Sequence, residues 1–522
     1  MVSEPTVFAL ACVASLALTA SMRSLAPLVG LTDKPDGHRK LHGSATPLGG
    51  GLAVYLATIA TVGVLFILPG PIRDRLLHEA PIILAVLGAA GLIVLVGLID
   101  DRFGMSGKQK LLWQLVAASL LIASGLVIQQ ITLFGYTIPL GVFAYPLTVF
   151  WFLGAMNALN LLDGIDGLAT MLGLIIAFTV SILAVITNNP AVAIIAMVFS
   201  GALLGFMWFN FPPATIFLGD AGSMQIGLMV GALAIMGSFK GPGTVLLVAP
   251  LAVWAIPIFD SAAAILRRKL TGRSIYATDR GHLHHRLLDL LGNNRRVLAV
   301  IALACAFTSL AALISVGVGD DMIALITCAA VAGVFVATGV FGRVELMLIG
   351  SRLRRMGGAM MPRGHGQRRA RRTTVRLQGS KQWELLFESL AESAEALDLH
   401  GIRLDVNLPA LREGFHGAWE NRQGTEPERD WNVDLPLLVD YNPIGRLRLS
   451  GTVGNVALWE AIPPMLEVIK QFDVRLRTLL APSTPSPEQA VTVSVGGAEE
   501  IPDATLALED AAPPRPVAPR PR

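Results

Sequence analysis

The sequence predicts an all-α polytopic membrane protein with about eleven transmembrane helices, followed by a small α+β cytoplasmic domain and a disordered tail. Of the 522 residues, 53% are hydrophobic and only 15% are charged, whereas soluble domains carry about 25% charged residues. Apolar runs of bilayer-spanning length, roughly 17–25 residues, recur from the N-terminus to about residue 341. The composition then turns basic and afterwards mixed, which predicts chain outside the membrane.

The apolar runs define the first domain, residues 1–345. The eleven expected spans lie at about 5–22, 48–68, 81–99, 111–130, 140–157, 168–187, 190–208, 222–239, 244–265, 297–317 and 322–341. Lys and Arg concentrate in the loops at 34–40, 102–110 and 266–296. By the positive-inside rule these loops are cytoplasmic, so the N-terminus is expected outside and the C-terminus inside. The three cysteines lie within apolar runs, which argues against a disulfide scaffold and a thiolate zinc site.

Three further regions are expected after the last span. Residues 346–378 form a basic juxtamembrane linker, with nine arginines between 352 and 376; it either lies on anionic lipid headgroups or serves as a topology anchor and solvated linker. Residues 379–480 form the soluble domain, with helices at 381–399 and 459–480, strands at 401–408 and 435–454, and a turn at 442–445. Residues 481–522 are rich in Pro, Ala and Glu and are expected to be disordered.

An acidic pair and two lysines follow the third span. Asp100 and Asp101 stand at the end of a helix, where the helix dipole disfavours negative charge, and carboxylates beside an apolar span need a partner. A divalent cation is one such partner, because Mg²⁺ uses few carboxylates and completes its shell with water and phosphate oxygens. Lys108 and Lys110 follow closely and either bind phosphate or anchor the topology. A solvated loop start is the alternative for the acids.

Polar residues recur every three positions in the next cytoplasmic segment. Asn157, Asn160, Asp163 and Asp166 would form a polar stripe on one face if the segment is helical. The residues between them are apolar or glycine, and Gly164 and Gly167 would allow a ligand or backbone to approach closely. Two buried carboxylates without a function are the less favoured explanation.

Three more segments face the same side. Asp220, in a Phe-Leu-Gly-Asp-Ala-Gly-Ser segment, is a candidate metal ligand or only a helix cap. A His-Leu-His-His-Arg segment, suited to an anionic ligand, contributes His282, His284, His285 and Arg286. Asp260 is expected to be structural and paired with Arg267 or Arg268. The first loop offers Arg39, His42 and a triple glycine, which either cradles phosphate or permits tight helix packing.

Carboxylates, lysines and histidines on one membrane face suit Mg²⁺-dependent phosphoryl chemistry on a membrane-embedded acceptor. Six segments carry a resemblance beyond this chemistry: DKPDGHRKLHGSATPLGGG, IDDRFGMSGKQKLLWQ, NALNLLDGIDGLA, FLGDAGS, PIFD and HLHHRL. In this order, the sequence resembles the polyprenyl-phosphate N-acetylhexosamine-1-phosphate transferases. The resemblance covers about residues 30–290 and does not extend past residue 345.

The resemblance implies a bacterial inner-membrane enzyme with a cytoplasmic site. Undecaprenyl phosphate would attack the β-phosphate of a UDP-sugar, releasing UMP, with Mg²⁺ as cofactor and Mn²⁺ as an alternative. Asp100 and Asp101 match the family's acidic pair and Asp220 its metal-binding aspartate; one acid of the pair either deprotonates the lipid phosphate or positions it. Lys108 or Lys110 would bind phosphate. The remaining substrate-binding candidates are Asn157, Asn160, Asp163, Asp166, His282, His284, His285, Arg286, Arg39 and His42.

The motif forms favour the branch that uses UDP-N-acetylglucosamine to begin a cell-envelope polysaccharide, such as O-antigen or teichoic acid. Another UDP-N-acetylated sugar, UDP-muramoyl-pentapeptide and a catalytically inactive scaffold or sensor are the alternatives. A transporter is disfavoured because no internal repeat is evident. The expected partners are the two substrates, anionic lipid headgroups at the basic linker and, as a further candidate, a second copy of the chain; no nucleic acid is expected.

Overall fold

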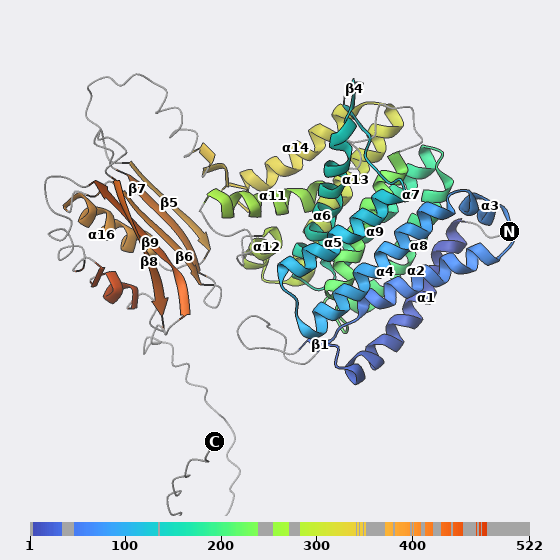
Figure 1. Ribbon diagram of the computed structural model, residues 1–522, viewed down its shortest axis with the longest axis horizontal. Helices are drawn as coiled ribbons and strands as arrows, with labels where there is room; N and C mark the ends of the chain where they lie inside the picture. The colour runs from blue at the N-terminus through green and yellow to red at the C-terminus, as the bar shows by residue number, and fades with distance from the viewer. Residues whose placement is uncertain are drawn as a thin grey trace, which may run out of the picture.

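The computed structural model describes two parts of the chain, a helical bundle and a C-terminal sheet (Figure 1). The described residues are 4–33, 46–133, 136–238, 254–270, 282–350 except 341, 344 and 348, 371–378, 382–396, 399, 401–408, 413–420, 430–439, 442–452, 466, 469–470 and 472–477.

The bundle consists of helices with short connecting elements. Its helices are α1 (Glu4–Leu25), α2 (Gly50–Ile67), α3 (Pro71–His78), α4 (Ala80–Phe103), α5 (Gly107–Ala123), α6 (Ala144–Leu162), α7 (Leu168–Ile186), α8 (Pro190–Asn210), α9 (Gly219–Ser238), α11 (Ala255–Leu270), α12 (Leu283–Leu291), α13 (Asn294–Val318) and α14 (Asp321–Ala337). The connections hold η1 (Ala26–Val29), η2 (Gly141–Phe143) and two hairpins, β1 (Thr32–Asp33) with β2 (Thr46–Pro47) and β3 (Gln130–Leu133) with β4 (Tyr136–Pro139).

Eight helical segments of the described chain are long and apolar enough to cross a membrane. They are centred on α1, α2, α4, α6, α7, α8, α9 and α13, and each coincides with a predicted span. The chain is therefore a membrane protein. In a bilayer the backbone groups of such a segment must bond within the segment, which is why these apolar runs form helices.

The three other predicted spans have different outcomes. The span at 111–130 was expected to be continuous, but α5 ends at Ala123 and the β3–β4 hairpin begins at Gln130. The helix ends early because the chain turns at Ser124 and Gly125, and Gly125 has a positive φ of 94°. The span at 322–341 matches α14, which is 17 residues long. Of the span at 244–265, residues 244–253 lie outside the described chain, and α11 covers the rest.

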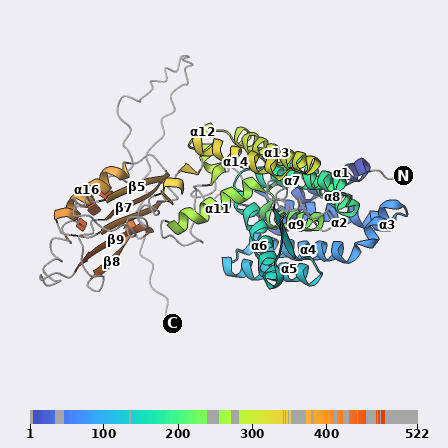
Figure 2. The ribbon, with the colours of Figure 1, turned by 90° about the horizontal axis from the view of Figure 1, so that it is seen from above.

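Helix α9 occupies the middle of the bundle. It packs against α2, α4, α6, α7 and α8, and Figure 2 shows α4–α6 on one side of it and α7 and α13 on the other. Two glycines permit close contact at its start: a Cβ on Gly97 of α4 would lie 2.2 Å from the Ala221 Cα, and a Cβ on Gly51 of α2 would lie 2.2 Å from the Gly222 nitrogen. The ends of α2 and α4 are thereby held at the N-terminus of α9.

The C-terminal part is an antiparallel five-stranded sheet with a helix on one face. The strands are β5 (Arg371–Gln378), β6 (Gly401–Leu408), β7 (Glu413–Glu420), β8 (Asp430–Val439) and β9 (Asn442–Thr452), in the order β5-β7-β6-β9-β8. Helix α16 (Trp383–Ala396) packs on β5, β6 and β7. Phe387 lies against Gly417, where a Cβ would be 2.6 Å from its ring. Trp383 and Trp419 are buried in this core.

Two predictions in this region are wrong, and one strand was missed. Residues 371–378 were expected in the basic linker but form β5, because Thr-Thr-Val-Arg-Leu has β-forming residues and pairs with β7. The turn predicted at Asn442–Gly445 is instead the start of β9, whose first residue, Asn442, pairs with Val439 of β8. Strand β7 was not predicted. Most of the helix expected at 459–480 and the whole tail at 481–522 lie outside the described residues.

Candidate active site

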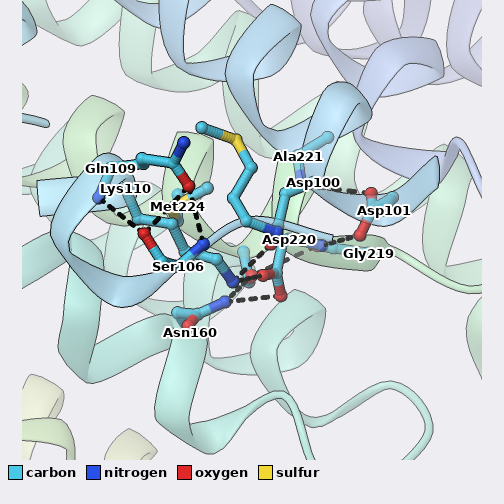
Figure 3. A network of polar contacts seen from close by, with 12 residues as sticks. Asp100, Asp101, Ser106, Gln109, Lys110, Asn160, Gly219, Asp220, Ala221 and Met224 are labelled. Atoms are coloured by element: carbon cyan, nitrogen blue, oxygen red, sulfur yellow. Dashed lines mark hydrogen bonds and ion pairs between the residues drawn. The ribbon is translucent and has the colours of Figure 1, made fainter. Parts of the chain in front are cut away.

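The first feature of the site is the N-terminus of α9, where an acid from α4 is bound. The Asp101 carboxylate accepts hydrogen bonds from the backbone N–H of Asp220 at 2.9 Å and of Ala221 at 3.4 Å (Figure 3). Unpaired N–H groups and the dipole make a helix N-terminus attractive to an anion. Gly219 is required at this turn, because its φ is +74° and a Cβ there would lie 2.4 Å from an Asp101 oxygen.

The second feature is a lysine shared by two carboxylates. The Lys110 Nζ lies 2.5 Å from an Asp220 oxygen and also forms an ion pair with Asp100, as Figure 3 shows. Asp100 also accepts the Met105 N–H at 2.6 Å. The Ser106–Gln109 capping box starts α5 and places Lys110 in its first turn. Lys108 is exposed, so of the two predicted lysines Lys110 is the one at the acidic pair.

Asn160 joins α6 to the same group. Its amide nitrogen donates to Asp220 at 2.8 Å and to the Ser223 hydroxyl at 3.0 Å. The other oxygen of Asp220 accepts from Lys110. Asp220 therefore bonds to side chains of α5 and α6 from its place on α9, and the acid is held in a fixed orientation.

The predicted four-residue stripe is only half helical. Helix α6 ends at Leu162, and Asp163 and Asp166 lie in the Gly-containing turn that follows. Asn157 donates to Gln114 at 2.9 Å, whereas Asp166 accepts the Ala214 N–H at 3.0 Å. The backbone leaves the helical conformation at Asp163, whose ψ is 42°, and Gly167, with a left-handed φ of 75°, precedes the start of α7.

Asp163 is the stripe acid whose carboxyl group interacts with those of Asp101 and Asp220. Burial, and then the negative charges of Asp220 and Asp101, raise the pKa of the Asp163 carboxyl well above its usual range. Four carboxylates, counting Asp100, thus lie near Lys110. Such an excess of negative charge favours an additional cation.

The histidine segment lies against the turn after Asp163. The ring of His284 packs on Gly164, where a Cβ would lie 2.4 Å from His284 Nε2. Both ring nitrogens of His284 are buried, and neither has a hydrogen-bond partner among the described residues. Burial, and then the charges of His285 and His282, lower the pKa of the His284 imidazole well below its usual value. Unpaired buried nitrogens are uncommon in proteins, and they suit a ligand that supplies the missing partners.

The remaining residues of the segment lie on the same short helix. Helix α12 begins at Leu283, directly after His282, and His285 and Arg286 are half-buried in its first turn. The segment predicted from sequence therefore gathers against the acid-bearing turn, with His284 in direct contact with it.

This geometry can be compared with known proteins. A family model described as "Glycosyl transferase family 4" matches residues 83–238, which include the acidic pair, the polar stripe and Asp220. A Bacillus subtilis protein named "Probable undecaprenyl-phosphate N-acetylglucosaminyl 1-phosphate transferase" is 34% identical over 301 residues, 57% of this chain and 81% of that protein. The chain belongs to the polyprenyl-phosphate N-acetylhexosamine-1-phosphate transferase family.

Two further relatives of this transferase have related names. The decaprenyl-phosphate N-acetylglucosaminephosphotransferase of Mycolicibacterium smegmatis is 36% identical, over 55% of this chain and 75% of that protein. The undecaprenyl-phosphate alpha-N-acetylglucosaminyl 1-phosphate transferase of Escherichia coli K12 is 31% identical, over 54% of this chain and 76% of that protein. The family expected from the six motifs is confirmed.

The first loop of the transferase contributes packing at the site. Arg39 and His42 lie outside the described residues. The Gly50 N–H donates to the Phe217 carbonyl at 3.1 Å, and the Gly51 N–H donates to the Leu218 carbonyl at 3.0 Å. These amides are therefore engaged with the segment before Asp220, as the packing alternative predicted.

The carboxylates can be tested against the expected magnesium ion. Among the described residues, no three His, Cys, Asp or Glu side chains form a group that could hold a metal. Asp100 and Asp220 nevertheless converge on one cation, the Lys110 ammonium. Mg²⁺ is commonly bound by one or two carboxylates together with water and phosphate, so this pair of oxygen donors fits it. Both oxygens of Asp101 already accept amide hydrogens.

Sequence reasoning assigned Asp260 the wrong partner and overlooked Gln114. Asp260 bonds to His282 rather than to Arg267 or Arg268, and Arg267 pairs with Glu345. These partners are 22 and 78 residues apart, which local spacing does not reveal. Gln114 follows Lys110 by one helical turn, and this spacing alone places both on one face of α5.

Proposed function

We propose that this chain transfers N-acetylglucosamine 1-phosphate from UDP-N-acetylglucosamine to undecaprenyl phosphate, releasing UMP and beginning a cell-envelope polysaccharide. The names of the three relatives support this reaction. The observation that carries the proposal is the Asp220 centre, where carboxylates of α4 and α9 share Lys110 at the start of α9. A phosphate brought there would meet a lysine already placed by two acids.

The reaction breaks one bond and forms one bond at the β-phosphorus of the sugar nucleotide. An oxygen of the lipid phosphate attacks this phosphorus, and the bond to the oxygen of the leaving UMP breaks. When bound, Mg²⁺ held by Asp100 and Asp220 would neutralise charge on the diphosphate; Mn²⁺ is an alternative. Lys110 would hold a phosphate oxygen, and either acid of the α4 pair would position or deprotonate the lipid phosphate.

The other predicted residues are proposed to bind the sugar nucleotide. Asn160 holds Asp220 in place, and Asp163 lies near Asp220. Without substrate, Asn157 is hydrogen-bonded to Gln114, and Asp166 is hydrogen-bonded to the Ala214 N–H. The remaining proposed contacts to the nucleotide or its diphosphate are His282, His284, His285, Arg286, Arg39 and His42, with Lys108 as an outer phosphate ligand.

We further propose an inner-membrane protein with eleven spans, the N-terminus outside, and the site and the C-terminal domain in the cytoplasm. The Lys and Arg distribution supports this orientation. The basic residues before β5 are proposed to lie on anionic headgroups, and a homodimer is a further proposal. The proposed domain limits are 1–345 for the transferase part, 371–480 for the soluble domain, which now includes β5, and 481–522 for the tail, so that the linker ends before Arg371.

The test uses purified full-length protein, undecaprenyl phosphate, Mg²⁺ and a panel of UDP-sugars. UMP release and the lipid product are followed together, with and without a chelator. We expect turnover with UDP-N-acetylglucosamine that the chelator abolishes and that Mg²⁺ or Mn²⁺ restores. Turnover only with another UDP-sugar or with UDP-muramoyl-pentapeptide would overturn UDP-N-acetylglucosamine as the proposed donor. No turnover from a folded sample would favour a scaffold or sensor.

A further inference from the structure

Asp260 lies on α11, outside the carboxylate cluster around Lys110, and is completely buried. We propose that Asp260 is a positioning residue, which orients the His282 imidazole and anchors the start of α12 so that the histidine segment is held against the acidic site. This inference rests on the proposed function, because its catalytic consequence is measured with UDP-N-acetylglucosamine.

Each oxygen of Asp260 has its own partner in the histidine segment. Oδ2 lies 2.9 Å from His282 Nδ1, and Oδ1 accepts the Leu283 N–H at 2.7 Å. The second bond satisfies an amide at the first turn of α12, a position that the His282 side chain leaves uncapped. One carboxylate from α11 therefore both orients the His282 imidazole and holds the start of α12.

The contact also decides which nitrogen of His282 is available. Nδ1 is the ring nitrogen that contacts the Asp260 carboxyl group, so Nε2 is the nitrogen that remains for a ligand. His282 is itself buried, which restricts its ring to this orientation.

The orientation is passed on to the acidic site through stacked rings. The His282 and His284 rings are nearly parallel, with centroids 5.8 Å apart and an interplanar angle of 12°. His284 in turn packs on Gly164, next to Asp163. If His282 turned, His284 would have to move, and Gly164 leaves it no free space on that side.

A second buried carboxylate, that of Glu345, also binds α11 and provides a matched control. Arg267 lies seven residues, about two helical turns, beyond Asp260 and forms a buried ion pair with Glu345. Glu345→Gln therefore removes the charge of a buried carboxylate that is bound to α11. Any general loosening of α11 should appear in this variant as well as in Asp260→Asn.

The experiment compares Asp260→Asn, Asp260→Ala, His282→Ala, the Asp260→Asn/His282→Ala double variant and Glu345→Gln in the full chain. UMP release is measured against UDP-N-acetylglucosamine and lipid phosphate, and hydrogen–deuterium exchange is measured on peptides covering residues 282–291. The exchange readout does not depend on turnover.

We expect Asp260→Asn to lower kcat/KM for the sugar nucleotide about 10- to 100-fold, with an unchanged KM for lipid phosphate. Exchange in α12 should stay low, because the asparagine oxygen still accepts the Leu283 N–H. Asp260→Ala should also raise exchange in α12. In the His282→Ala background, Asp260→Asn should lower kcat/KM for the sugar nucleotide by less than about twofold, because the effects of residues that act as a unit are not additive.

Wild-type kcat/KM in Asp260→Asn, an equal loss in Glu345→Gln, or additive losses in the double variant would each overturn the proposal. If the wild-type protein shows no turnover, the proposed function fails on its own. The anchoring of α12 then stands if Asp260→Ala raises exchange there, and it falls if exchange is unchanged.

Discussion

Around the start of α9, four carboxylates lie near one lysine, whereas on the C-terminal sheet Asp405 and Asp434 each have a basic partner. Asp405 contacts His416 at 2.6 Å, and Asp434 receives two hydrogen bonds of 2.7 Å from Arg448. The two regions also differ in their buried histidines, because in the described part of the chain His284 has no hydrogen-bond partner and His416 has one. Unbalanced charge persists in a fold where a ligand completes it, and balanced pairs indicate a structural role.

The largest expected effect comes from the unbalanced region. Asp220→Asn removes the charge that Lys110 and the proposed cation share, while its amide can still bond to neighbours. We expect a loss of about 100- to 1000-fold in kcat, the range for removing one preorganised electrostatic contact. UMP release measures it. Asp434→Asn, on the exposed sheet surface, is the control, and wild-type turnover in Asp220→Asn would remove this acid from the mechanism.

The next effect is confined to the C-terminal sheet. Trp383→Ala removes a fully buried ring and leaves Glu413 without its 2.7 Å hydrogen bond from the indole. We expect the sheet to lose about 3–5 kcal/mol of stability, seen as faster limited proteolysis of residues 371–477. UMP release should stay at the level of a chain that ends before residue 371. If Trp383→Ala lowered turnover more than this truncation does, the C-terminal sheet and the bundle would be functionally coupled.

A smaller effect depends on pH and on His284. Its pKa is lowered by burial, so below the ordinary value, near pH 6.5, the unfolded chain binds a proton that the folded chain does not. Stability should fall as pH decreases through this range, by up to about 1.4 kcal/mol per pH unit. Thermal unfolding in detergent at pH 7.5 and 5.5 measures it. His284→Asn should show a weaker dependence, and an equal one would exclude His284 as the source.

The smallest effect concerns the exposed pair on the sheet. The hydrogen bonds from Arg448 lower the pKa of the Asp434 carboxyl, so its contribution is present above about pH 4 and disappears as pH falls further. Exposed pairs contribute about 0.2–1 kcal/mol. Asp434→Asn should therefore lower stability at pH 7 by no more than this, measured by denaturant unfolding of the sheet. A larger loss of stability would show that the Asp434–Arg448 pair contributes more than an exposed ion pair usually does.

The site was predictable where residues close in the chain carry the chemistry. Asp100, Asp101, Asp220 and the histidine segment stand out because charged groups are costly beside apolar spans. The stripe from Asn157 to Asp166 was only partly correct, because α6 ends at Leu162 and the backbone leaves the helical conformation at Asp163. The strand at 371–378 was hidden by its arginines, which suggested a linker although the residues between them favour a strand.

By itself, the sequence determined the membrane class and the order of the motifs, because apolar length and charge are properties of single segments, and its six motifs carried the resemblance to the transferase family. Only the tertiary structure decided that Lys110 rather than Lys108 joins the acids, that Asp101 binds the start of α9, and that Asp260 holds His282. These contacts join residues up to 120 positions apart, and packing of α4, α5 and α11 around the centre of the bundle places them within hydrogen-bond distance.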